Sequence, residues 1–243
     1  MEDLKDRGSN KSRIQGFWIF SVTGLATMLL PIAVQAHIVP YDLTKLSKTD
    51  VAFIYLKLGY THILPNGFDH ILFVLGLFLL NPRLKSVITQ ATAFTIAHSI
   101  TLGLAMKGII TPVSSIVEPI IALSIVFVAV ENIYTSQLKP WRILIVFAFG
   151  LIHGLGFASA LKELSLPKID FFTSIIMFNI GVELGQISII VAAYFLLGHW
   201  FKNKEWYRRR IVVPISLMIA IVAFYWTIER VFEISIYNKI AGL

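Results

Sequence analysis

The chain contains no cysteine and few charged residues, and both absences narrow its class. Without cysteine it can form no disulfide and offer no thiolate, so a bound metal must be held by imidazole, carboxylate or amide oxygen. Charged residues occupy 14% of the 243 positions, whereas about a quarter is usual in soluble domains. Hydrophobic residues occupy 56%. This composition predicts an integral membrane protein.

Several motifs of soluble enzymes are also missing. The sequence has no Gly-x-Ser-x-Gly elbow, no His-Glu-x-x-His pair and no glycine-rich phosphate loop, which argues against serine hydrolysis, zinc-protease chemistry and direct use of ATP. The net charge of +7 comes from lysines and arginines in short connections between apolar runs. That distribution is typical of membrane topology and contact with anionic lipid, so we expect no nucleic-acid binding.

The N-terminal region reads as a targeting segment. Residues 1–36 combine a basic start, a long apolar run and a small residue, Ala36, which is typical of a secretory signal peptide; an uncleaved anchor helix is the alternative. Cleavage after Ala36 would expose His37, whose amine and ring could chelate a metal, although a solvated terminal histidine is the simpler interpretation. Residues 37–61 predict an extracytoplasmic segment with a short amphipathic helix on the outer surface.

Residues 62–243 contain six apolar segments, at 68–81, 87–106, 113–133, 142–161, 171–198 and 211–231. Most approach the roughly 20 residues that a helix needs to cross a ~30 Å hydrocarbon core. Three connections concentrate basic residues, at 81–85, 139–142 and 202–210. The positive-inside rule places these inside and the mature N-terminus outside. The sequence thus predicts an all-α integral membrane protein, with a signal peptide or anchor helix followed by a six-helix transmembrane bundle.

Ionisable and amide side chains recur in or beside these segments. Such groups are costly in lipid unless they face a polar interior, so they indicate a functional site. Counting inward at ~1.5 Å per residue puts Asp69 and His70 at the outer mouth and several others roughly 8 to 12 Å deep. Asn179, Glu183 and Gln186 share one helical face. We therefore predict a polar pocket in the outer half, with candidate metal ligands His62, Asp69, His70, His98, Glu118, His153, Asn179 and Glu183.

Imidazoles with carboxylates and amide oxygen suit divalent ions such as nickel, cobalt, zinc or copper. Three uses are open at this point. A permease would bind the ion in the pocket and release it inward, an intramembrane enzyme would use the metal to activate water against a lipid or peptide, and a proton relay would need no metal.

The motifs resemble those of the HupE/UreJ family, and in particular its second branch. The resemblance covers most of residues 59–190 in order. It is carried by the His-x6-Asp-His entry from His62 to His70 and by the runs TAFTIAHSITL, VEPIIALSI, FGLIHGLGFA and FNIGVELGQ. This sequence has one residue more between its first histidine and Asp69 than the better-known branch, and a single His-Gly, at His153, in place of a longer histidine-rich signature.

The resemblance implies a multi-pass protein of the bacterial inner membrane that helps to supply nickel or cobalt to metalloenzymes. It maps the family's Asp-His entry onto Asp69 and His70. We expect a nickel or cobalt permease, with a membrane-embedded metal-dependent hydrolase as the alternative. An accessory role would involve a metalloenzyme-maturation partner or a homo-oligomer; metal ions and membrane lipids are the other expected partners.

Overall fold

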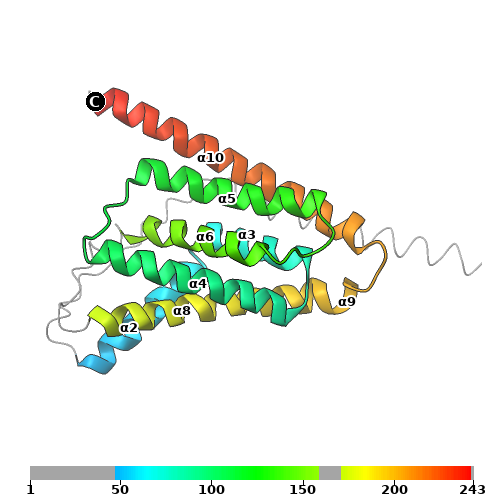
Figure 1. Cartoon of the computed structure of the whole chain (residues 1–243), viewed down its shortest axis with the longest axis horizontal. Coiled ribbons are helices and arrows are strands. Elements are labelled where there is room, and N and C mark those ends of the chain that lie inside the picture. The colour runs from blue at the N-terminus through cyan, green and yellow to red at the C-terminus, as the bar shows by residue number, and fades with distance from the viewer. Residues whose placement is uncertain (1–46, 159–170, 242–243) are drawn as a thin grey trace, which may run out of the picture. The chain divides into compact units, whose positions relative to one another are not determined.

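The computed structural model describes residues 47–158 and 171–241, with side chains described as far as Phe232 in the last helix. The predicted signal peptide or anchor at 1–36, His37 and the beginning of the 37–61 segment lie outside the described residues. Among those that are described, every regular element is a helix (Figure 1).

Each predicted apolar segment corresponds to a helix, and one further helix precedes them. In chain order the helices are α2 (Lys48–Ile63), α3 (Phe68–Leu80), α4 (Leu84–Met106), α5 (Ser114–Tyr134), α6 (Arg142–Gly156), α8 (Phe171–Ala193), the π-helical turn η3 (Tyr194–Gly198), α9 (His199–Phe201), the π-helical turn η4 (Arg208–Val212) and α10 (Val213–Ala241).

The number of membrane crossings differs from the prediction. In the described part of the chain, four helices are long and apolar enough to cross a membrane: α4, α5, the continuous run from α8 to α9, and the run from η4 into α10. The pair α2 and α3 forms a fifth candidate, bent by 67° at a short break, and α6 is a shorter apolar helix of 15 residues. A multi-pass membrane protein is confirmed, whereas a bundle of six spans is not.

The break between α2 and α3 follows from local sequence. Pro65 has no backbone N–H and Gly67 lies at the start of α3, so the stretch Leu64–Gly67 ends one helix and begins the next. A methyl group on Gly67 would overlap the backbone of His62 and Ile63, so only glycine lets the chain turn this closely. The break brings the C-terminal end of α2 beside the first turn of α3.

Helix α2 packs lengthwise on α8 (Figure 1). Its buried side is a four-residue repeat of Val51, Tyr55, Gly59 and Ile63. Gly59 and Gly181 let the two backbones touch, since a methyl group on either would overlap the opposite helix. Helix α2 is therefore bound firmly to the bundle; its predicted position at the outer surface of the membrane remains a prediction.

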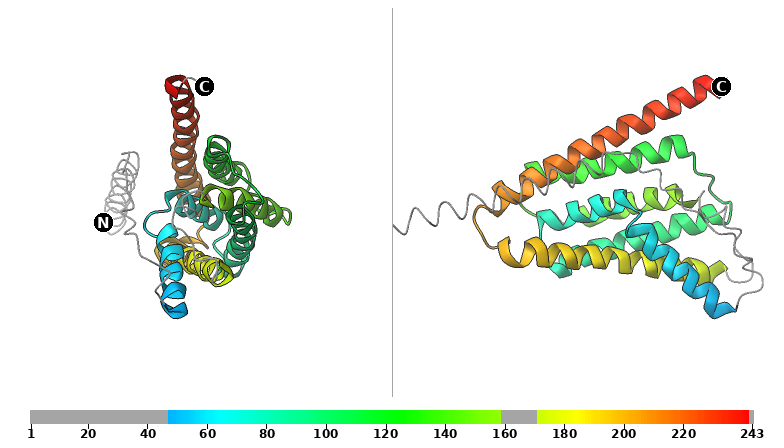
Figure 2. Two further views of the ribbon diagram at one scale, coloured as in Figure 1. Left: turned by 90° about the vertical axis from the view of Figure 1, so that its left-hand side faces the viewer. Right: turned by 180° about the vertical axis from the view of Figure 1, so that it is seen from behind.

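Glycines also bring α6 against α4. A methyl group on Gly150 would overlap the backbone of Phe94, and one on Gly154 would overlap His98 and Thr101. Helices α5 and α10 lie side by side on the other flank of α3 (Figures 1 and 2). At one end of the bundle α4 and α6 finish and α5 and α8 begin; we call this the pocket end. The three basic connections lie at the other end, called the basic end.

A buried ion pair lies near the basic end. Arg142 Nε and a Glu131 carboxylate oxygen are 3.2 Å apart, and both side chains are nearly inaccessible. Arg142 also donates to the Asn132 side-chain oxygen at 3.3 Å, and the Asn132 amide donates to the Gly76 carbonyl oxygen at 2.8 Å. These contacts join α3, α5 and α6 beneath the apolar core.

Candidate metal centre

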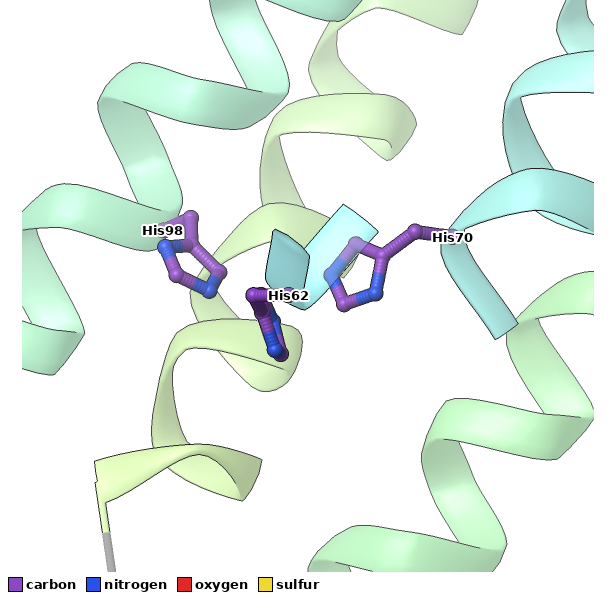
Figure 3. A group of neighbouring side chains, drawn as sticks. All are labelled: His62, His70 and His98. Carbon is purple, nitrogen blue, oxygen red and sulfur yellow. The ribbon is translucent and has the colours of Figure 1, made fainter. Parts of the chain in front are cut away.

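Three histidines from three helices meet at the break between α2 and α3 (Figure 3). His62 lies in the last turn of α2, His70 in the first turn of α3, and His98 in α4. One ring nitrogen from each histidine lies within 4.8 Å of the corresponding nitrogens of the other two. The ring centroids of His62 and His70 are 4.8 Å apart, and His98 lies 6.2 Å from His62.

The position of His70 corrects the depth expected from sequence. Counting from the beginning of the apolar run at residue 68 placed His70 at the outer mouth, yet its ring lies 6.1 Å from that of His98. His98 is eight residues from the end of α4 at Met106, which is about 12 Å along a helix. Helix α2 accounts for the difference, because α3 begins only where α2 has already entered the bundle.

The tautomer of His98 is set by Asn179 on α8. His98 Nδ1 lies 3.1 Å from the Asn179 side-chain oxygen, and the Asn179 amide nitrogen donates to the Ile175 carbonyl oxygen at 2.8 Å. Since the amide nitrogen is engaged with Ile175, the oxygen must accept from His98, which puts the ring proton on Nδ1. The lone pair of His98 is thereby left on Nε2.

His153 adjoins the cluster from α6. Its ring centroid is 5.1 Å from that of His70, and its Nε2 lies 3.0 Å from the Ser124 hydroxyl oxygen. Ser124 donates its own proton to the Ile121 carbonyl oxygen at 2.6 Å, so the hydroxyl oxygen accepts from His153 Nε2. His153 therefore keeps its lone pair on Nδ1, which is buried.

Aromatic rings enclose the histidines. Phe157 lies 4.0 Å from His62, centroid to centroid, and Phe178 lies 5.6 Å from His62 and 5.1 Å from Phe157. Beneath the cluster, Phe73 contacts both Phe94 and His153, at 5.1 and 5.4 Å. The enclosure restricts ring rotation and excludes water on these sides.

A cavity of about 190 Å³ reaches the histidines from the pocket end. Its polar lining comprises His62, Asp69, His70, Glu118, His153 and Arg230. Of the two carboxylates, Glu118 is exposed, whereas Asp69 is engaged by Arg230 Nη2 at 3.0 and 2.9 Å. The cavity therefore leads from an opening with two carboxylates and one guanidinium to imidazole nitrogens.

Glu183, a predicted metal ligand, lies apart from the histidine cluster and the cavity. One of its oxygens accepts from the Thr92 hydroxyl at 2.6 Å, between α8 and α4. It does not line the cavity and is not in the histidine group. Gln186, on the same face, accepts from Thr95 at 3.2 Å. These residues form a polar seam between two helices below Asn179.

The donor set fits a borderline divalent metal. The Nε2 atoms of His62, His70 and His98 are buried and have no hydrogen-bond partner among the described protein groups. Such atoms are costly to bury unless something binds them. Metal–imidazole bonds of ~2.1 Å allow two nitrogens on one ion to be at most ~4.2 Å apart. A separation of up to 4.8 Å is therefore close to what a metal needs.

Two residues of this site were not predicted from the sequence. Arg230 is the last residue but one of the apolar segment 211–231, at the same end of the bundle as Asp69 and Glu118, and a charge in that position was a usable signal. Ser124 gave no signal, because serine is common between membrane helices. The positions of both became evident only from the packing of α5 and α10.

Comparison with known proteins identifies a family and no individual relative. A family model described as HupE / UreJ protein matches residues 40–230. No curated protein and no solved structure matches the chain significantly. The match spans α2 to α10 up to Arg230 and so includes every residue of the histidine cluster and the cavity.

Proposed function

The chain belongs to the HupE/UreJ family, and on that premise we propose that it is a permease for a divalent transition metal, with nickel or cobalt as cargo. The bacterial inner membrane is the proposed location, with the pocket end facing outward and the basic end facing the cytoplasm. That orientation follows the positive-inside rule, since Arg83, Lys139 and the run Arg208–Arg210 lie at or next to the basic connections.

The observation that carries the proposal is the set of three buried imidazole nitrogens, from His62, His70 and His98, gathered within 4.8 Å. Neutral imidazoles without thiolate favour borderline metals over calcium or magnesium, which prefer oxygen. Asn179 supports the assignment, because a histidine that binds metal usually donates its other N–H to a fixed acceptor.

The roles follow from position. His62, His70 and His98 would bind the ion, and His153 Nδ1 would supply a fourth nitrogen. Asp69 and Glu118 would attract the cation at the opening of the cavity. Asn179 would orient His98. Glu183 would help to hold α8 against α4 through its hydrogen bond with Thr92, without contacting the metal.

The described conformation supports a pathway open on one side. The cavity ends at the histidines. Phe73 and Phe94 pack against His153, and the Glu131–Arg142 pair lies further toward the basic end. A permease must alternate between openings, so passage of the ion would require α3 to move relative to α4 and α6.

Two measurements on one set of proteins test the function. Purified wild type is titrated with nickel and cobalt by calorimetry, and the same protein in liposomes is assayed for radiolabelled uptake. His62→Ala, His70→Ala, His98→Ala and His153→Ala are compared with His199→Ala, an exposed histidine at the basic end. We expect saturable uptake, lost in the first three variants, reduced in His153→Ala and unchanged in His199→Ala.

Binding and uptake together separate the alternatives. Metal bound at a fixed stoichiometry without uptake would reject the permease and favour a metal-dependent enzyme or a metal-delivery role. Well-folded protein that neither binds nor transports either metal would reject the whole proposal.

A further inference from the structure

Arg230 occupies an unexpected position for a cation-binding pocket. Its Nη2 donates to both oxygens of Asp69, at 3.0 and 2.9 Å, and its side chain lines the cavity with the histidines. The guanidinium thus neutralises the carboxylate that directly precedes His70 in the chain. A divalent ion in the cavity would meet a positive charge beside the negative charge that should attract it.

Other groups hold the guanidinium in place. Arg230 Nη1 donates to the backbone carbonyl oxygen of Glu118 on α5 at 3.1 Å, and the guanidinium lies 5.9 Å from the Trp226 ring one turn earlier on α10. Arg230 thereby connects α10 to α3 and to α5. Because both Arg230 and Asp69 are about a quarter exposed (22% and 26%), the pair can separate without leaving a deeply buried charge.

We propose that Arg230 is an internal competitor for the metal, held on Asp69 while the pocket is free of metal and displaced from it when a divalent cation binds. This inference depends on the ion pair between Arg230 and Asp69. Among the described residues, Asp69 is the only carboxylate that stands next to a histidine of the cluster in the chain. The inference rests on the proposed function, since it requires the pocket to bind a metal. It adds a means of selecting divalent over monovalent cations, and it couples metal binding to the contact between α10 and α3.

The physical consequence is selection by charge. A monovalent cation gains about half the Coulomb energy of a divalent cation from the same carboxylate, so it competes poorly with a guanidinium that donates twice. A divalent ion that also bonds to imidazoles can displace it. Once displaced, Arg230 no longer connects α10 to α3, so binding loosens that contact.

The test is equilibrium titration of the full-length protein in detergent with nickel alone. Arg230→Gln removes the charge and should tighten nickel binding about tenfold, because the repulsion and the competing ion pair are both lost. Arg209→Gln, which removes an exposed charge from the basic end, should leave the affinity unchanged. In an Asp69→Asn background the effect of Arg230→Gln should be clearly smaller than in wild type, since the competing ion pair is already absent and only the repulsion remains.

A second readout does not depend on a variant. Hydrogen exchange of wild-type residues 226–232 should become faster when nickel is added, whereas ligands normally slow exchange near their sites. If Arg230→Gln does not fold, this measurement and the titration of Arg230→Lys decide the matter. Arg230→Lys keeps the charge but loses the planar fork, so it should bind nickel more tightly than wild type by less than about tenfold.

The outcomes distinguish the two proposals. Nickel binding by wild type that is unchanged or weakened in Arg230→Gln would overturn the role of Arg230 and leave the metal site standing, as would slower exchange at 226–232. Nickel binding by Arg230→Gln but not by wild type would support the proposal and show that Arg230 competes more strongly than the expected tenfold. If folded wild type and Arg230→Gln both fail to bind nickel and cobalt, the metal site and the competitor are rejected together.

Discussion

His98 and Asn179 form a hydrogen bond of 3.1 Å that joins α4 to α8 beside the histidine cluster. Because Asn179 is itself held by the Ile175 carbonyl oxygen, the bond leaves His98 only one arrangement, with its lone pair toward His62 and His70. An amide would thus prepare the imidazole of His98 for the proposed metal without adding charge to the membrane interior.

Replacing Asn179 tests that preparation. Asn179→Leu keeps the volume but removes the acceptor, so the His98 ring can rotate and change tautomer. We expect nickel affinity to fall about 10- to 100-fold, the usual effect of losing such a partner. Calorimetric titration measures the change, with Asn203→Leu at the exposed basic end as control. Unaltered affinity in Asn179→Leu would mean that His98 is not a ligand.

The glycine at the break gives a second prediction. In Gly67→Ala the methyl group would overlap the backbone at His62 and Ile63, so the end of α2 must shift away from α3. We expect nickel affinity to fall at least tenfold while the helical content stays constant, because only the spacing between His62 and His70 is disturbed. Asn66→Ala, at the exposed neighbouring position, should bind as wild type. Equal affinity in both variants would show that the break does not set the spacing.

The contact between α2 and α8 gives a prediction of stability. Gly181→Ala places a methyl group against the Leu56 carbonyl oxygen and the Tyr60 amide nitrogen, and should destabilise the protein by about 1–3 kcal/mol through overpacking. Gly103→Ala, on α4, has open space apart from Ile175 and should be neutral or stabilising by up to ~1 kcal/mol. Thermal unfolding in detergent compares the two. Similar melting temperatures would indicate that α2 does not pack closely on α8.

The buried ion pair gives a fourth prediction. Arg142→Met leaves Glu131 buried without its partner and should cost about 3–5 kcal/mol, whereas the double variant Glu131→Gln/Arg142→Met should recover much of that loss. Glu205→Gln, exposed at the same end, serves as control. The midpoint of thermal unfolding is the measurement, and a double variant no better than Arg142→Met would contradict the pairing.

The helices themselves could be predicted well. Hydropathy placed segments at 68–81 and 113–133, and the structure has helices at Phe68–Leu80 and Ser114–Tyr134. The reason is physical: an apolar run in lipid has little alternative to a helix, because its backbone groups must hydrogen-bond to one another. The family resemblance was also confirmed, since it depends on the order of whole motifs.

The depth of α3 could not be predicted. Lys48 and Lys57 gave the preceding segment an interfacial composition, and its one informative residue, Gly59, acts only through the backbone of α8. Glu183 shows the opposite difficulty. It shares a face with Asn179, yet Thr92 holds its carboxylate away from the histidines, which no spacing rule reveals. Helical periodicity gives the face of a residue but not the reach or partner of its side chain.

If His62 and His70 bind the metal as proposed, the bend between α2 and α3 makes the affinity for that metal a function of a backbone angle. His62 ends one half of the broken helix and His70 begins the other, so the distance between these donors changes whenever the 67° angle changes. Thermodynamic reciprocity then requires that a metal held by both histidines resist bending, and that bending weaken its hold on the metal. The four residues from Leu64 to Gly67 would serve as a transducer, converting mechanical work on a helix into release of an ion.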